Sequence, residues 1–160
     1  MLKSYMLLRN AFKVYCVRWR YAYFYGAKNE LLTEQRMDEL INIYWNEHFN
    51  RYSTNELKEI KDFSRNKIGL DCSGFITLIS NISGSSAMLF EKCPYKTSVT
   101  EGKAGSLLYK KSHCGIDIGY GYCMHIPIEN HTIEISKIQD IGFTDSGELP
   151  DYDYSEANNY

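Results

Sequence analysis

The hydrophobic pattern of this chain changes its period at Gly105, and that change limits the possible folds more than any other feature. Before Gly105, apolar residues recur at the spacing of amphipathic helices. After Gly105, apolar and polar residues alternate in short runs, as they do in half-buried strands. A chain that forms its helices first and its strands second is expected to fold as an α+β domain with an antiparallel sheet.

The two periods give specific elements. Helices are predicted at 2–19, at 31–48, from Ser53 onward, and at 73–82. Strands are predicted at 106–109, 113–118, 122–126 and 132–135. Ser53 and Glu56 match a capping box, in which each side chain satisfies a free backbone N–H of the other residue. Residues 81–86 break the fourth helix, and 91–104 are expected to form an irregular crossing loop.

Length and composition indicate one globular domain. The chain has 160 residues, of which 44% are hydrophobic and 24% are charged. We expect a single domain over 1–154, with an N-terminal helix within 1–19 and a helical insertion at 27–68. A polar tail is expected at 155–160.

The charge and the apolar runs exclude two classes of partner. The net charge of −2 gives no general attraction to nucleic acid. No apolar run approaches the length of a membrane span, so stable membrane insertion is not expected. We expect a monomer, and the sequence shows no signal peptide that would explain export.

The five cysteines, at positions 16, 72, 93, 114 and 123, are an odd number and include no C-x-x-C pair. Neither a disulfide framework nor a zinc site is therefore expected, and we expect no metal and no cofactor. At least one thiol must be free. A free thiol needs a reducing setting, a buried position or a catalytic purpose.

Cys72 has the local setting of a nucleophile. It lies at the predicted start of a helix, where free N–H groups and the helix dipole favour a thiolate. The small residues Ser73 and Gly74 follow it and leave room for a substrate carbonyl, and the N–H groups there could hold an oxyanion. The alternative is a buried structural cysteine, since cysteine is among the most buried residue types.

A thiolate nucleophile needs a base, and His113 and His125 are suited to that role. If Gly119-Tyr120-Gly121 forms a three-residue hairpin loop, the two histidines become diagonal neighbours on one face of the sheet. One imidazole could then orient the other. A two-residue loop would place them on opposite faces. His48 is expected on the apolar stripe of a helix and His131 in a solvated turn.

Three segments resemble the NlpC family of papain-like cysteine peptidases. Residues 70–76 (Leu-Asp-Cys-Ser-Gly-Phe-Ile) resemble the D-C-S-G-[FL]-[IV] motif at the family's nucleophile. Residues 113–119 (His-Cys-Gly-Ile-Asp-Ile-Gly) resemble its H-[VI]-G-[IV]-Y-[IL]-G strand, and His125 lies twelve residues after the histidine, as the family's third polar residue does. Residues 23–26 (Tyr-Phe-Tyr-Gly) resemble its Y-x-[WY]-G element.

The resemblance implies a papain-like α+β fold and hydrolysis of amide bonds in peptidoglycan stem peptides at the bacterial cell wall. It implies Cys72 as nucleophile, His113 as base and His125 as the residue that orients the base. Tyr23 and Ser73 would support the oxyanion or the thiolate. Asp71 and Tyr25 would contact substrate. The insertion and the segments 105–109 and 143–150 resemble a subgroup from phages and mobile elements.

Two positions depart from the family pattern. Cys114 stands where the family has a β-branched residue and is expected to fill the core. Asp117 stands where an aromatic is frequent, and strict alternation would place it on the face of His113. Two alternatives therefore remain: a catalytically silent wall-binding or assembly module, and an acyltransferase or amidase acting on another substrate.

Overall fold

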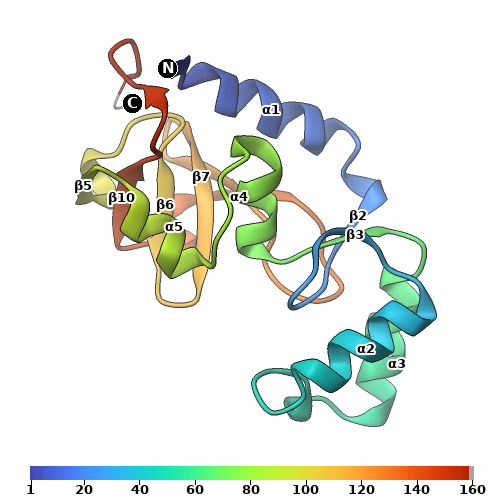
Figure 1. Ribbon diagram of the computed structural model, residues 1–160. Coiled ribbons are helices and arrows are strands. Elements are labelled where there is room, and N and C mark those ends of the chain that lie inside the picture. The colour runs from blue at the N-terminus through green and yellow to red at the C-terminus, as the bar shows by residue number, and fades with distance from the viewer. Residues whose placement is uncertain (159–160) are drawn as a thin grey trace.

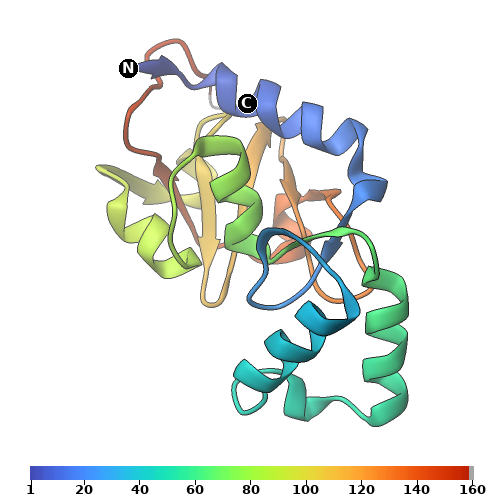
Figure 2. The same cartoon turned by 45° about the vertical axis from the view of Figure 1, so that its right-hand side comes forward.

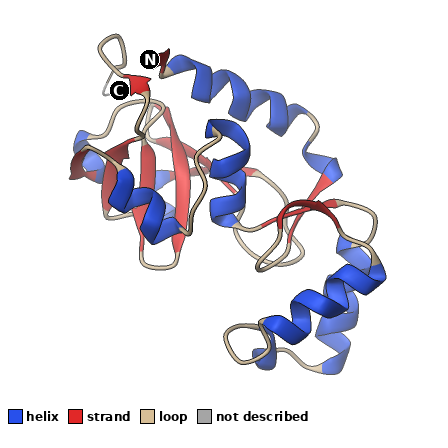
Figure 3. Cartoon of the chain, in the orientation of Figure 1, coloured by secondary structure: helices blue, strands red, loops and turns tan. Residues whose placement is uncertain are grey.

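The computed structural model describes residues 1–158 and has an α+β architecture, as predicted (Figure 1, Figure 3). The helices are α1 (Tyr5–Cys16), α2 (Glu34–Ile43), α3 (Thr54–Ser64), α4 (Cys72–Ser80), α5 (Ser86–Lys92) and α6 (Ile138–Ile141). The strands are β1 (Leu2–Lys3), β2 (Tyr21–Tyr23), β3 (Lys28–Leu31), β4 (Ile68–Leu70), β5 (Tyr95–Ser98), β6 (Leu107–Lys110), β7 (His113–Gly119), β8 (Tyr122–His125), β9 (Glu134–Lys137), β10 (Asp145–Glu148) and β11 (Tyr152–Asp153).

An antiparallel sheet of six strands forms the centre of the domain, in the order β5-β10-β6-β7-β8-β9. Strands β6 to β9 follow one another in the chain, so hairpins and short connections place them. Strand β10 instead enters between β5 and β6, although it follows β9 and α6 in the chain. The prediction of an irregular loop over 91–104 was wrong for β5, which is stabilised by its pairing with this late strand.

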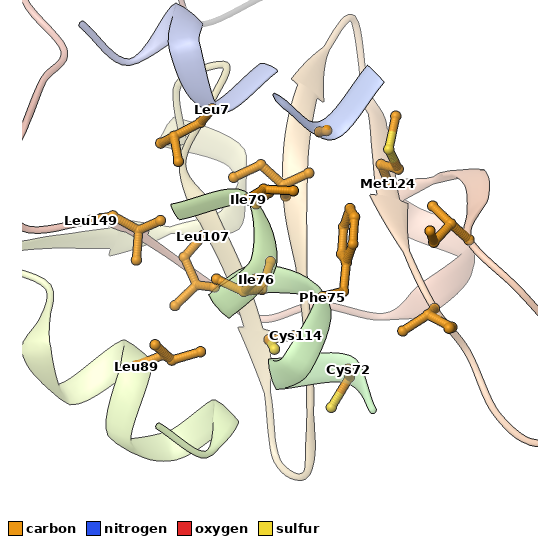
Figure 4. Packing of buried hydrophobic residues seen from close by; sticks show 14 of the residues in the cluster. Leu7, Cys72, Phe75, Ile76, Ile79, Leu89, Leu107, Cys114, Met124 and Leu149 are labelled. Atoms are coloured by element: carbon orange, nitrogen blue, oxygen red, sulfur yellow. The ribbon is translucent and has the colours of Figure 1, made fainter. Parts of the chain in front are cut away.

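Helix α4 packs across β7 and forms the main core with α1 and α5 (Figure 4). Phe75 and Ile76 on α4 and Ile116 on β7 are fully buried there. Alternation along β7 sends Cys114 and Ile116 toward α4, whereas Gly115 and Asp117 face the other side of the sheet. The helix ends at Ser80, with Asn81 in the left-handed conformation as its cap.

The insertion at 27–68 projects away from the six-stranded sheet and has a small core of its own (Figure 1, Figure 2). Helices α2 and α3 pack around Phe49, Leu40 and Ile60, which are at most 1% exposed. The predicted capping box at Ser53 and Glu56 is confirmed, with both reciprocal hydrogen bonds present. A three-stranded sheet in the order β2-β4-β3 joins the insertion to α4.

Three predicted elements differ most from the observed ones. Helix α1 spans Tyr5–Cys16 rather than 2–19, because Leu2–Lys3 pairs with β11. Helix α2 ends at Ile43 rather than 48, because His48 and Phe49 turn inward to pack their rings against Tyr25. The last predicted strand starts at Glu134 rather than 132.

The late start of this last strand has a local cause. The backbone of His131 accepts a hydrogen bond from the N–H of Tyr23 at 2.9 Å. The Thr132 hydroxyl donates to the carbonyl of Arg18 at 2.6 Å. These contacts hold residues 131–132 against the N-terminal segment, so pairing with β8 begins only at Glu134. In the predicted tail, the carbonyl of Asn158 accepts from Ala104 at 3.1 Å, and 159–160 lie outside the described residues.

The β7–β8 hairpin has the predicted register near the histidines, although its loop is shorter than predicted. Gly119 pairs with Tyr122, so the loop has two residues, Tyr120 and Gly121, both with positive φ. A two-residue loop alone would turn His113 and His125 to opposite faces. The register shifts by one residue between Asp117 and Gly119, and this bulge restores the original alignment.

Asp117 lies beside this bulge and is 5% exposed. Its carboxylate accepts a hydrogen bond from the N–H of Gly119 at 2.8 Å, and burial raises its pKa to about 6. Within residues 1–158, no hydrogen bond or ion pair joins its side chain to His113.

We predict that Asp117→Asn stabilises the domain at neutral and alkaline pH. The raised pKa means that the folded protein holds the proton more tightly than the unfolded chain, so the fold loses stability as the pH rises from about 4 to about 6 and does not regain it above that range. Urea unfolding at pH 8 should show a gain of roughly 3 kcal/mol, and the gain should disappear near pH 4. Equal stability of the two proteins at pH 8 would contradict the prediction.

Candidate active site

Cys72 is the first residue of α4, which places its thiol among the free N–H groups of the first helical turn. Asp71 caps the helix, and its Oδ1 accepts from the N–H of Gly74 at 2.7 Å. The cap fixes where the helix begins and therefore where the thiol lies. Cys72 retains 8% exposure, and Figure 4 shows it at the end of α4 that lies beside β7.

Two neighbours on β7 favour the thiolate form of Cys72. Hydrogen bonding to the Cys114 thiol, followed by hydrogen bonding to His113 and the charge of its ring, lowers the pKa of Cys72 to about 5. Burial opposes this shift. Hydrogen bonding to Cys72 and complete burial raise the pKa of Cys114 well above its ordinary value, so Cys114 keeps its proton. A thiolate and a protonated thiol therefore lie side by side.

His113 and His125 form the predicted pair. Nε2 of His113 lies 2.8 Å from Nδ1 of His125, and the two ring centroids are 5.1 Å apart. This contact uses one nitrogen of His113 and leaves Nδ1 for the thiol of Cys72. The sequence prediction that the two histidines are neighbours on one face of the hairpin is confirmed.

The environment of His125 fixes its protonation state. Burial is the largest cause that lowers its pKa to about 4, and the charge of His113 is the next. His125 is therefore neutral at pH 7 and carries one ring proton. Its Nε2 lies 3.0 Å from the hydroxyl of Ser136 on β9. With Nε2–H donating to Ser136, Nδ1 accepts from the Nε2–H of His113, which orients the His113 ring.

Gly115 and Phe143 hold this pair from behind. A Cβ at Gly115 would lie 3.1 Å from Cβ of His125 and 3.2 Å from Phe143. The glycine thus lets both rings approach the strand closely. The ring of Phe143 stacks on His113 with centroids 5.5 Å apart and planes 9° apart. Sequence reasoning did not identify Phe143 or Ser136, because neither belongs to a local motif with the histidines.

Tyr23 and Tyr25 line a cleft of about 580 Å³ together with both histidines. Burial, followed by the negative charge of Cys72, raises the pKa of Tyr23, so its hydroxyl remains a hydrogen-bond donor. Burial also raises the pKa of Tyr25, with the charge of Glu47 as the next cause. The other lining residues come from the insertion, the β6–β7 turn, the segment after β8 and α6: Glu47, His48, Arg51, Lys110, Lys111, Ser112, Pro127, Ile128, Asp140 and Ile141.

Asp71 and Ser73 flank Cys72 and share a partner that the sequence did not suggest. The ammonium of Lys28, on β3, lies 2.7 Å from Oδ1 of Asp71 and 2.6 Å from the hydroxyl of Ser73. The Ser73 hydroxyl also donates to Asp71 at 3.1 Å. Both side chains are therefore held in place by the protein itself. The Lys28 side chain is 47% exposed, so this cluster is open to solvent on one side.

The other two histidines differ from each other. His48 is 5% exposed and lies in the wall of the cleft, although it is no longer helical. His131 is exposed, and its Nε2 is 3.9 Å from Glu134. Across residues 1–158, no group of three or more His, Cys, Asp or Glu side chains is arranged to hold a metal ion.

Comparison with known proteins gives no family model that matches and no significant match among curated proteins or solved structures. Nor does any helix in the described part of the chain have the length and apolar character needed to cross a membrane.

We predict that iodoacetamide alkylates Cys72 with a midpoint near pH 5, because the thiolate is the reactive form. Below the midpoint, the rate should fall about tenfold per pH unit. Cys114→Ala should move the midpoint upward, since the variant lacks the thiol that hydrogen-bonds to Cys72. Peptide mass spectrometry measures the rate, and the exposed Cys16 is an internal reference. A parent midpoint near 8.5, or no shift in the variant, would contradict the assignment.

Proposed function

We propose that this protein is a papain-like cysteine peptidase of the NlpC type, which hydrolyses amide bonds in peptidoglycan stem peptides. The observation that carries the proposal is the thiol of Cys72 at the start of α4, beside a His113 ring that His125 orients. A nucleophile, a base and a residue that orients the base are the elements of a catalytic triad. The order and spacing of the motifs support the NlpC type.

Catalysis would pass through an acyl-enzyme. The thiolate of Cys72 attacks the carbonyl carbon of the scissile amide and forms a tetrahedral oxyanion. His113 gives its proton to the departing amine, and the C–N bond breaks to leave a thioester. His113 then removes a proton from water, and the resulting hydroxide attacks the thioester. The carboxylic acid product leaves as the Cys72–carbon bond breaks.

The oxyanion requires hydrogen-bond donors. The N–H of Cys72 lies in the first turn of α4, where N–H groups have no intrahelical acceptor. The hydroxyl of Tyr23 is a second donor, since its raised pKa keeps it protonated. Each donor of this kind contributes on the order of 10²-fold to the rate in other hydrolases.

The cleft suits a peptide with charged groups. Among its lining residues, Arg51, Lys110 and Lys111 are cationic, whereas Glu47 and Asp140 are anionic. Stem peptides carry carboxylate and amine groups that such a lining can pair with. We propose that Asp71 and Tyr25 contact the substrate and that Ser73 supports the active site. We expect the protein to act as a monomer at the bacterial cell wall.

The test compares the parent protein with Cys72→Ala on peptidoglycan fragments of both lysine and diaminopimelate type. The parent should release cleaved stem peptides, and the variant should release none above background, because the thiol is the attacking group. Mass spectrometry of the products identifies the bond. The rate should decline below about pH 5 as Cys72 becomes protonated.

Three results would change the assignment. No cleavage by folded parent protein, together with binding to the fragments, would indicate a silent wall-binding module. Transfer of the acyl group to an added amine, in place of hydrolysis, would indicate an acyltransferase. Equal cleavage by the parent and by Cys72→Ala would remove Cys72 from the mechanism.

A further inference from the structure

A buried carboxylate lies behind the cleft and belongs to none of the motifs. Glu129, in the segment between β8 and β9, is 5% exposed. Its Oε1 contacts Nε2 of His48, and its Oε2 accepts from the hydroxyl of Tyr52 at 2.7 Å. Both partners belong to the insertion, more than seventy residues earlier in the chain. Glu129 therefore joins the insertion to the segment that follows the catalytic strand β8.

His48 connects Glu129 to Tyr25, a residue that lines the cleft. The ring of His48 stacks on the ring of Tyr25, with centroids 4.2 Å apart and planes 7° apart. Tyr44 packs against the edge of Tyr25, and a Cβ at Gly26 would lie 2.1 Å from the Tyr44 ring. Tyr25 is thus enclosed by rings from the insertion on one side. Its other side lines the cleft.

The same segment also supports Tyr23. The carbonyl of His131, two residues after Glu129, accepts from the backbone N–H of Tyr23 at 2.9 Å. The charge of Glu129 is one of the causes that raise the pKa of Tyr23. Both cleft tyrosines are therefore backed by residues 129–131, one through the backbone and the other through the His48 ring.

A buried carboxylate is costly even when it is paired, and an apolar residue of the same volume would often be as stable or more so. Core packing alone therefore gives no reason for a glutamate here. Glu129 instead supplies directional hydrogen bonds. One oxygen orients the His48 ring, and the other orients the Tyr52 hydroxyl. An imidazole held in one plane presents one fixed face to Tyr25.

We propose that Glu129 and His48 are positioning residues, which hold Tyr25 as an ordered wall of the cleft so that the insertion binds the peptide part of the substrate. This inference rests on the proposed function, because it assigns the insertion a role in binding the peptide that Cys72 cleaves. Neither residue touches the reacting atoms. Their loss should weaken substrate alignment and leave the chemistry of Cys72 unchanged.

The experiment uses Glu129→Leu, which removes both acceptors at similar volume, and His48→Ala, which removes the stacked ring. His48→Phe keeps a ring against Tyr25 and loses the contact with Glu129. Glu134→Leu is the matched control, because Glu134 is a carboxylate on β9 whose side chain is 44% exposed. Each protein is assayed for KM and kcat on the fragment that the parent cleaves, and for alkylation of Cys72 by iodoacetamide.

We expect Glu129→Leu and His48→Ala to raise KM about tenfold and to change the iodoacetamide rate less than twofold. His48→Phe should recover part of the loss. Tyr25→Leu should raise KM by a similar factor, and adding His48→Ala to it should have little further effect, since both changes remove one contact. Unchanged KM in Glu129→Leu, additive effects in the double variant, or an equal effect of Glu134→Leu would overturn the inference.

A second probe separates this inference from the proposed function. An acetyl-tripeptide chloromethyl ketone alkylates a thiolate by loss of chloride and is long enough to reach the cleft wall. The ratio of its rate to the iodoacetamide rate needs no peptidoglycan. Suppose that the ratio falls about tenfold in His48→Ala and that the parent protein cleaves no fragment. This result would support the role of His48 in the cleft wall and would reject peptidoglycan as the substrate. A ratio that does not change would reject the proposal that His48 holds Tyr25 as a wall of the cleft.

Discussion

The packing of α4 across β7 is the interaction on which the site depends. It places the first residue of the helix, Cys72, beside the first residue of the strand, His113. Phe75 and Ile76 are fully buried in this contact, so the helix cannot slide without exposing them. A slip of one helical turn would move the thiol by about 5.4 Å, more than the length of a hydrogen bond. The apolar core thus sets the distance between the Cys72 thiol and the His113 ring.

The electrostatic character of the site follows from how each group is placed around that contact. Cys72 lies at a helix N-terminus beside a protonated thiol and an imidazole, and all three favour the thiolate. His125 is buried and neutral, so it accepts from His113 and does not compete for charge. Burial alone would raise the pKa of Cys72, but the hydrogen bonds to its neighbours lower that pKa by more. The result is one thiolate beside a His113 ring that an uncharged partner orients.

Sequence reasoning located the residues whose relations are local. Cys72 was found from its helix start, and His113 and His125 from their spacing in a hairpin. Even there, the loop has two residues rather than three, and the bulge between Asp117 and Gly119 restores the register. A bulge leaves little trace in the alternation of apolar residues. The remaining partners come from distant segments and share no local pattern with Cys72 or the histidines: Lys28, Glu129, Ser136 and Phe143. Cys114 was expected as core filling, and it also contacts Cys72.

The insertion shows how one wall of a cleft can be attached to such a site. Its apolar core is separate from that of the sheet, so its helices fold around Phe49 rather than around α4. Two separate cores joined only by apolar contact would leave the wall free to shift, because apolar packing is not directional. Hydrogen bonds are directional, and a carboxylate with two acceptor oxygens can fix two side chains at once. Glu129 has that arrangement between His48 and Tyr52. A buried charge at this junction exchanges some stability for orientation, and orientation is what a cleft that aligns a substrate requires.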